Sequence, residues 1–162
     1  MDEFSARRLF LRAGGASTAL VALAATGLLK PARVLAAEWP QWQREAFTAN
    51  TFAGALQTYG AAASTESRDI VFSAPDIAEN GAQVVVDIVS KLPGSQTIAV
   101  FAEKNPMPLA ASVRFANGAL PQLRIPLKLS ETMRVRAVVR TEDGKTFHAQ
   151  REIRVTLGGC GG

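Results

Sequence analysis

The sequence predicts a mostly β protein, an antiparallel β-sandwich of about seven strands with an N-terminal helix and a flexible C-terminal arm. Three observations support this prediction. Short runs rich in β-branched residues alternate with turn dipeptides from residue 69 onward, an apolar-faced helical segment precedes them, and the chain ends in Gly158-Gly159-Cys160-Gly161-Gly162. Short strands at such regular spacing are typical of a sandwich.

The first element of the chain is predicted to be an export signal. Arg7 and Arg8 form a twin-arginine pair, and a run of small and apolar residues extends from Ala13 to Leu29. Small residues then mark a cleavage point after Ala36 or Ala37. A transmembrane anchor is the alternative, but the run is rich in Gly, Ala, Ser and Thr, and basic residues follow it closely. We therefore expect a twin-arginine signal peptide over residues 1–36, export to the periplasm and no stable membrane anchor.

Removal of this leader also removes most of the excess positive charge. The full chain has 18 Lys and Arg against 14 Asp and Glu, and the leader holds five of the former and two of the latter. The mature part therefore has 13 basic and 12 acidic side chains, which does not suggest nucleic-acid binding. About 125 residues remain, enough for one domain. We assign residues 37–157 to the sandwich with its helix and residues 158–162 to the arm.

A helix is expected in the proline-free stretch from Gln41 to Tyr59, with Gly60 as its stop signal. One face of this stretch is apolar and is expected to pack on the domain. The residues with the i, i+3, i+4, i+7 spacing are Ala49, Phe52, Ala53, Leu56 and Tyr59.

Seven strands are expected after the helix, separated by turn signals such as Asn-Gly and Asp-Gly. Their predicted bounds are Asp69–Phe72, Ala82–Ser90, Gln96–Ala102, Ala111–Ala116, Gln122–Leu129, Thr132–Arg140 and Thr146–Leu157.

Two of these strands carry charged residues that need an interpretation. In Thr132–Arg140, apolar residues alternate with Arg134, Arg136 and Arg140, which indicates one buried and one solvated face. The alternative is a cationic surface for an anionic substrate or an acidic partner. In the last strand, Arg151 interrupts the inward-facing apolar positions and indicates a bulge or an edge.

The rest of the sequence offers little catalytic chemistry. His148, the only histidine, has no cysteine or carboxylate cluster at metal-ligand spacing, so we interpret it as a solvated strand residue. Ser64, Ser67 and Ser95 lie outside any nucleophile-elbow pattern, and no glycine-rich phosphate loop is present. The sequence predicts neither an enzyme active site nor a metal or cofactor.

Cys160 is the only cysteine, and it lies in the middle of an all-glycine tail. Such a tail is expected to be a flexible coil, in which the steps from Leu157 to Cys160 span about 10 Å when extended. The tail has no Lys, Arg or His to favour the thiolate, so a visited partner must activate it. In an exported protein a lone cysteine indicates either a reactive thiol or an intermolecular disulfide, including a disulfide-linked homodimer.

Three segments resemble the SoxY family, the sulfur carriers of the bacterial Sox thiosulfate-oxidising system. They are Pro75–Ala82, Lys104–Leu109 and, most specifically, Val155–Gly162. The resemblance implies an immunoglobulin-like sandwich and a complex with SoxZ, as a heterodimer or a higher assembly. It also implies that Cys160 carries the substrate covalently, on an arm formed by Gly158, Gly159, Gly161 and Gly162.

The resemblance further implies a sequence of transient partners. A cytochrome c complex, SoxAX, couples thiosulfate oxidatively to the thiol. SoxB then releases sulfate, and a sulfane dehydrogenase, where present, oxidises the remaining sulfur. The carrier is not itself the catalyst. The surface for SoxZ is left open: Val84-Val85-Val86 forms either that surface or a strand buried on both faces of the monomer.

Two other classes compete with the carrier hypothesis. The terminal Gly-Gly is similar to that of ubiquitin-like sulfur carriers, but export away from cytoplasmic ATP and the cysteine within the tail argue against this class. A structural interaction protein, whose lone thiol forms an intermolecular disulfide, is the stronger alternative.

Overall fold

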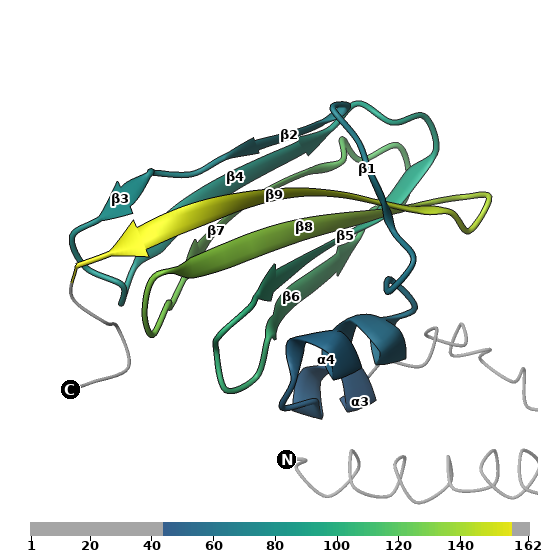
Figure 1. Ribbon diagram of the computed structural model, residues 1–162. Helices are drawn as coiled ribbons and strands as arrows, with labels where there is room; N and C mark the ends of the chain where they lie inside the picture. The colour runs from purple at the N-terminus through teal and green to yellow at the C-terminus, as the bar shows by residue number, and fades with distance from the viewer. Residues whose placement is uncertain (1–43, 157–162) are drawn as a thin grey trace, which may run out of the picture. The chain divides into compact units, whose positions relative to one another are not determined.

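The computed structural model describes residues 44–156. The predicted leader and arm fall outside these residues, so their assignments stay predictions. Within the described part, two β-sheets face each other and form a sandwich (Figure 1), which confirms the predicted fold class.

The larger sheet contains six strands in the order β1-β9-β8-β5-β6, with β3 also paired to β9. Its strands are β1 (Thr65–Glu66), β3 (Ile77–Ala78), β5 (Ser95–Ala102), β6 (Leu109–Arg114), β8 (Met133–Thr141) and β9 (Thr146–Val155). The smaller sheet has the order β2-β4-β7. Its strands are β2 (Ile70–Ser73), β4 (Val84–Ser90) and β7 (Gln122–Leu127).

The core lies between the two sheets, because alternate residues of each strand point to the same side. On β4 the inward residues Val84, Val86 and Ile88 are buried, and on β8 Val135 and Val139 are fully buried. Each such aliphatic side chain stabilises the fold by roughly 1.5–3 kcal/mol relative to its exposed state. Alternation of apolar residues therefore determines which face of each strand is buried.

The seven predicted strands are all present, with bounds shifted by a few residues. The prediction missed β1 and β3, which pair in parallel with the two ends of β9. A two-residue strand is too short for an alternating pattern, so the sequence gives no signal for either. The sandwich is therefore antiparallel except at these two short pairings.

The predicted helix is present as two helices, α3 (Arg44–Thr48) and α4 (Phe52–Tyr59). The break occurs because Thr51 is extended and its side chain accepts a hydrogen bond from the Gly54 N–H. This capping bond satisfies a backbone donor that would otherwise be unpaired at the start of α4. Gly60 ends α4 in the left-handed conformation with φ of 74°, as the stop signal predicted.

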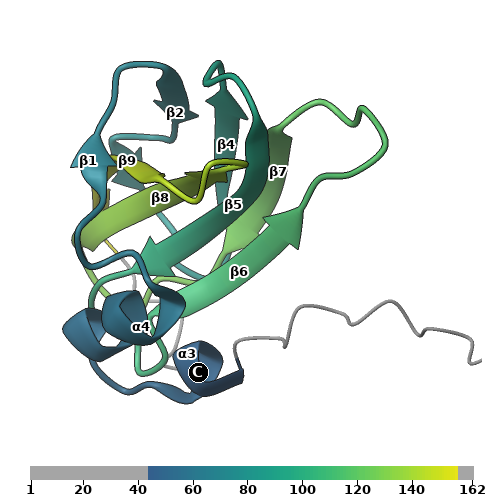
Figure 2. The same cartoon turned by 90° about the vertical axis from the view of Figure 1, so that its right-hand side faces the viewer.

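Both helices cover the outer face of the larger sheet (Figures 1 and 2). Leu56 and Tyr59 of α4 pack in one cluster with Phe101 of β5 and Val138 of β8. The Tyr59 and Phe101 rings meet edge to face, with centroids 5.5 Å apart, a favoured arrangement for aromatic pairs. Ala53, expected on this face, is exposed instead, because the break before α4 changes which residues face the sheet.

The arginines of β8 do not all lie in solvent, in contrast to the solvated face that the sequence predicted. Arg134 is exposed, but Arg136 and Arg140 are half-buried beneath the helices. Their guanidinium carbons each lie 5.2 Å from the centroid of an aromatic ring, Arg136 over Phe52 and Arg140 over Tyr59. Arg140 also donates a hydrogen bond to the Tyr59 carbonyl. These two arginines attach α4 to the sheet through cation–π contacts.

Arg151 marks an edge and not a bulge. The β8–β9 register is continuous from Met133 opposite Ile153 to Arg140 opposite Thr146. The Arg151 side chain reaches the other sheet, where Nη1 donates to the Phe72 carbonyl and Nη2 lies 3.0 Å from Asp76 Oδ1. Arg151 thus bridges the two sheets along one side of the sandwich.

Candidate functional site

The predicted site residues, Cys160 and Gly158, Gly159, Gly161 and Gly162, lie outside the described residues. The structure instead describes the root to which they attach, the C-terminal end of β9. There the Thr156 N–H donates to the Ala78 carbonyl at 3.1 Å, and the Thr156 hydroxyl donates to the Glu79 carbonyl at 2.9 Å. The last described residue is therefore held against β3 by both its backbone and its side chain.

A second attachment holds the preceding residue from the other side. The Thr132 hydroxyl accepts a hydrogen bond from the Val155 N–H at 2.9 Å and lies 3.5 Å from the Val155 carbonyl oxygen. One residue before Val155, the Arg154 N–H donates to the Asp76 carbonyl at 3.0 Å. Residues 154–156 are thus bonded on both sides, which gives the predicted arm a fixed base.

The same end of the sandwich gathers the segments that carry the SoxY resemblance. Segment Pro75–Ala82 contains β3 and bonds directly to the end of β9. Segment Lys104–Leu109 is joined to the β7–β8 loop, where Asn105 Nδ2 donates to the Lys128 carbonyl at 2.7 Å and Asn105 Oδ1 accepts from the Ser130 N–H. Segments distant in sequence therefore lie at the same end of the sandwich as the end of β9, which sequence order alone does not show.

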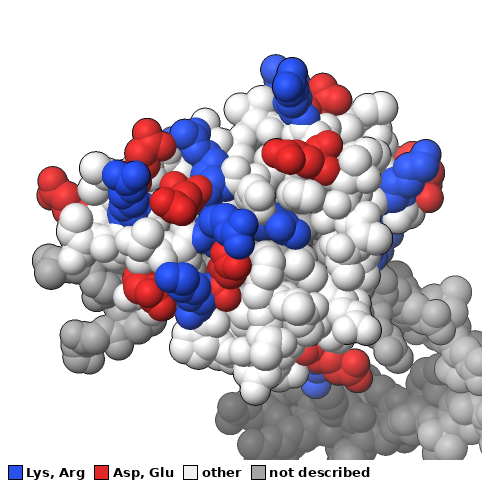
Figure 3. Space-filling view, viewed as in Figure 1, with Lys and Arg blue, Asp and Glu red and all other residues white. Residues whose placement is uncertain are grey.

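Charges of both signs lie on this part of the surface. Figure 3 shows Lys, Arg, Asp and Glu interspersed over the region of β8 and β9, whereas the area over α4 is mostly uncharged. Lys104 pairs with Glu131 at 3.2 Å, and Arg134 pairs with Glu103 at 2.9 Å. The hydrogen bond from Arg134 lowers the pKa of Glu103. The pairing of Arg134 with Glu103 and the mixture of signs argue against the cationic surface considered as an alternative.

Two large apolar side chains within the resemblance segments are nevertheless exposed. Ile77 of β3 is 58% exposed and Met107 of the β5–β6 loop is 60% exposed. Exposed apolar side chains of this size are suitable contacts for another protein, and Ile77 lies directly against the end of β9.

His148 is half-buried and bonded, which corrects its interpretation as a solvated residue. Its Nδ1 atom lies 3.0 Å from the Ser64 hydroxyl and 3.1 Å from the Ser64 carbonyl. A bond to the carbonyl requires the proton on Nδ1, and that nitrogen then cannot accept the hydroxyl proton. Burial and the nearby Arg136 lower the pKa of His148. In that tautomer Nδ1 cannot activate the Ser64 hydroxyl as a nucleophile.

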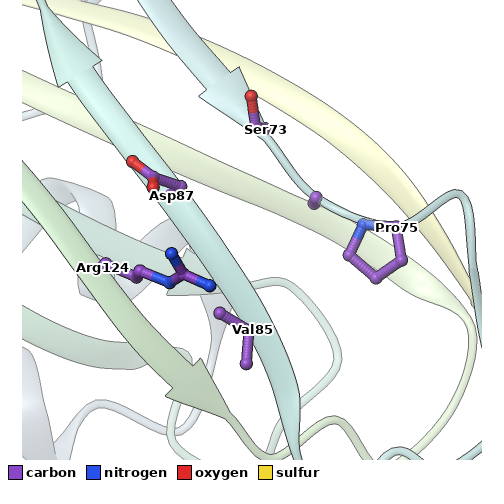
Figure 4. A pocket seen from close by; sticks show the side chains of 6 residues that line it. Ser73, Pro75, Val85, Asp87 and Arg124 are labelled. Carbon is purple, nitrogen blue, oxygen red and sulfur yellow. The ribbon is translucent and has the colours of Figure 1, made fainter.

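The outer face of the smaller sheet is the second surface of interest. Val84 and Val86 are buried, whereas Val85 is 40% exposed, so the strand is not buried on both faces as one alternative held. Val85 borders a shallow depression of about 330 Å³ (Figure 4). Its lining residues are Ser73, Ala74, Pro75, Val85, Asp87 and Arg124. Among residues 44–156 no helix packs on this face.

Within residues 44–156, no group of three or more His, Cys, Asp and Glu side chains could hold a metal ion. No helix in the same part of the chain has the length and apolar character needed to cross a membrane.

Comparison with known proteins identifies the family. A family model described as sulfur oxidation protein SoxY matches residues 55–160. The solved structure of the sulfur carrier protein SoxY from Chlorobium limicola f. thiosulfatophilum is 31% identical, with a TM-score of 0.59, and the match covers 70% of this chain and 99% of that one.

Other solved structures are less similar. A superoxide reductase (neelaredoxin) from Ignicoccus hospitalis is 19% identical with a TM-score of 0.48, covering 54% of this chain and 80% of that one. A putative superoxide reductase from Thermotoga maritima is 15% identical with a TM-score of 0.47, covering 53% and 84%. No curated protein matches the chain. From the family match and the Chlorobium structure, the chain belongs to the SoxY family of sulfur oxidation proteins.

Proposed function

We propose that this protein is a periplasmic carrier that holds thiosulfate-derived sulfur covalently on Cys160 and presents it to the enzymes of thiosulfate oxidation. The observation that supports this most is the SoxY family match, which extends through Cys160. The similar protein from Chlorobium limicola is itself described as a sulfur carrier.

The chemistry of the proposed loading step is an oxidative coupling. The Cys160 thiol and thiosulfate form a new sulfur–sulfur bond, which releases one proton and two electrons. The cytochrome c partner accepts the electrons. Hydrolysis by a second enzyme then adds water, breaks the bond to the terminal sulfonate and releases sulfate, which leaves a persulfide on Cys160. The carrier supplies the sulfur nucleophile and the partners supply the redox and hydrolytic groups.

The geometry of the root supports a carrier. Several enzymes must reach the same sulfur in turn, so the attachment point has to project from a stable body. Residues 154–156 are hydrogen-bonded on both sides of β9, and the five residues after Leu157 are four glycines and one cysteine. Glycines carry no side chain to obstruct a narrow cleft in a partner.

We also propose the partners and compartment that the family resemblance implies. The protein pairs with SoxZ and meets SoxAX, SoxB and a sulfane dehydrogenase transiently. The twin-arginine pattern at Arg7 and Arg8 supports export to the periplasm. The carrier itself performs no catalysis in this scheme.

Substitution of Cys160 tests the proposal. Incubation of Cys160→Ser with thiosulfate and the loading enzyme should give no sulfur adduct in the intact mass, because a hydroxyl cannot replace the thiolate as nucleophile. A matched control is the double variant Cys160→Ser/Ala119→Cys, which moves the thiol to the exposed β6–β7 loop. It should also remain unloaded. An adduct on the Cys160→Ser chain would show that sulfur is carried elsewhere.

A further inference from the structure

One row of side chains crosses three strands of the larger sheet near the end of α4. Thr97 of β5 lies opposite Arg114 of β6 on one side and opposite Arg140 of β8 on the other. Neighbouring strands are roughly 4.8 Å apart, so the Cα atoms of the two arginines lie about 10 Å apart with Thr97 between them. We call Arg114 and Arg140 the arginine pair.

The row faces away from the core between the two sheets. Ile98 follows Thr97 along β5 and belongs to that core. Val139 precedes Arg140 along β8 and belongs to it as well. Because successive side chains of a strand point to opposite faces, Thr97 and Arg140 point outward. Ser112, two residues before the arginine of β6, contacts α4 on the outer face, so that arginine points outward too.

The hydroxyl group at the centre of the row lacks a hydrogen-bond partner. The Thr97 Oγ1 atom is buried, yet it bonds to no group within residues 44–156, and it is the one buried side-chain oxygen or nitrogen in that range of which this is true. Folded proteins bond nearly all buried polar groups, and an exception indicates a position for a water molecule or an ion. A ligand between the two arginines would supply the missing acceptor.

Arg140 is held in place by groups that are not carboxylates. Its Nη2 atom donates to the Tyr59 carbonyl at the end of α4, and its guanidinium carbon lies 5.2 Å from the centroid of the Tyr59 ring. Gly60 leaves room for this contact, since a Cβ added there would lie 3.3 Å from Nη2. A guanidinium group has five N–H donors, and the bond to the carbonyl uses one. Arg140 therefore has a fixed position and keeps donors for an anion.

Arg114 adds a second cation that is free to bind. It is exposed and forms neither an ion pair nor a side-chain hydrogen bond with any of residues 44–156. No carboxylate in that range forms an ion pair with Arg140 either. The other arginines on this face of β8 differ, because Arg134 pairs with Glu103 and Arg136 donates to a side-chain amide of β9. The arginine pair therefore holds two positive charges without a described counter-charge.

We infer that the arginine pair and Thr97 form a binding site for a tetrahedral dianion of the sulfate class, which includes sulfate and thiosulfate. The two guanidinium groups balance two negative charges, and their planar donors match the oxygens of such an anion. The arginines bind the anion from both sides, and the Thr97 hydroxyl donates to it from the sheet between them.

This site is separate from the proposed site of covalent attachment. Thr146 lies opposite Arg140 at the start of β9, and Val155 ends that strand, so the two ends of β9 are about 30 Å apart. Cys160 follows Val155 by five residues, a reach of at most about 18 Å. An anion held by the arginine pair is therefore a free ion and not cargo on the same chain. The inference does not rest on the proposed function, because such a site binds anions whether or not the chain carries sulfur.

The test is an NMR titration of the exported Cys160→Ser chain, in which thiosulfate cannot react with the thiol. Backbone amides and arginine Nε–H groups are followed while sodium sulfate replaces sodium chloride at a constant ionic strength of about 0.2 M, which keeps charge screening unchanged. We expect saturable shifts at Thr97, Arg114 and Arg140, and the same shifts with thiosulfate. Acetate should bind at least about tenfold more weakly, because a single carboxylate leaves one arginine without a counter-charge.

Two variants and a matched control locate the site. Arg114→Gln should raise the sulfate Kd at least about tenfold, because it removes a charged donor. Arg124→Gln should leave the Kd unchanged, since Arg124 is an exposed strand arginine without a described ion pair on the smaller sheet. Thr97→Val should also raise the Kd about tenfold, because the hydroxyl bond to the anion is lost. Without sulfate, its free energy of unfolding should equal or exceed that of the parent chain, because an unpartnered buried hydroxyl is removed.

The absence of saturable shifts at the three residues of the row overturns the inference. So does an Arg114→Gln or Thr97→Val chain that binds sulfate as tightly as Arg124→Gln. Acetate binding as tight as sulfate binding would contradict a site for dianions and indicate a site for an acidic side chain. None of these outcomes bears on whether Cys160 carries sulfur, which is measured separately by mass.

Discussion

At the scale of single residues, the protonation of His148 affects the stability of the folded protein. This residue lies where β1 meets β9, opposite Glu66 in the parallel pairing and bonded to Ser64 just before β1. Burial is the first cause that lowers its pKa, and the charge of Arg136 is the second. The folded protein therefore holds the imidazole in its neutral form more strongly than the unfolded chain does.

The protein should lose stability as the pH falls through the range in which the unfolded imidazole gains a proton. A folded-state pKa below the ordinary value of 6.5 means that the unfolded chain binds more protons there, so the free energy of unfolding rises with pH. The contribution is complete above about pH 6.5 and declines below it. Urea unfolding at pH 5.5 and 7.5 should show a smaller pH effect in His148→Gln than in the wild type. Equal pH effects in the two proteins would contradict this account.

At the scale of elements, the end of β9 forms the base of the proposed arm and is bonded to both neighbouring segments. Thr132 contacts Val155 from the β8 side, and Thr156 contacts Glu79 from the β3 side. The two threonines hold opposite edges of the same strand end, so their separate contributions can be measured.

Thr132→Val should remove the hydrogen bond that holds Val155, at the end of β9, on the β8 side, without unfolding the sandwich. The substitution removes the hydroxyl that accepts the Val155 N–H at 2.9 Å, and a bond of this kind is worth about 1 kcal/mol. Amide exchange at Val155 should therefore be about fivefold faster, as measured by NMR. Thr156→Val is the matched control, since its hydroxyl bonds to a carbonyl and not to that N–H. Unchanged exchange at Val155 in Thr132→Val would refute the assigned role.

The strands could be predicted from the sequence because period-2 alternation and turn dipeptides are local signals. The break at Thr51 could not, because helical spacing continues through it and only the capping bond to Gly54 distinguishes an N-cap from a helix interior. Arg136 and Arg140 were expected in solvent for a related reason. A strand pattern shows which residues share a face, but not that a helix from elsewhere covers that face.

At the scale of the whole molecule, the proposed function assigns support to the packed sandwich and sulfur carriage to the terminal segment. Cys160 and its glycines could be predicted as the site from composition and motif alone, since they are contiguous, and that assignment stays a prediction. The surroundings of the arm root could not, because Asp76, Asn105 and Thr132 reach that end only through the sheet topology. The arginine pair beside Thr97 likewise cannot be found without the strand order.

Bulky residues in the arm should impair function without affecting the body. Gly159→Trp and Gly161→Trp should leave the Tm unchanged, because the described sandwich is complete by Thr156, which is bonded to Glu79. Turnover of thiosulfate with the partner enzymes should fall by at least about tenfold, since an indole cannot pass where glycine can. Ala119→Trp, in an exposed loop, is the matched control and should retain activity. Full turnover with Trp at both glycine positions would show that steric access does not explain the glycines.

The central claim is that Cys160 carries sulfur covalently in the cell, and its most direct test is mass spectrometry of the wild-type protein. The protein is isolated from cells during thiosulfate oxidation, without reductant, and its C-terminal peptide is sequenced. We expect sulfane or thiosulfonate adducts on Cys160 that disappear on reduction. A peptide found only as a disulfide with another protein, or modified only at its terminal carboxylate, would contradict the account.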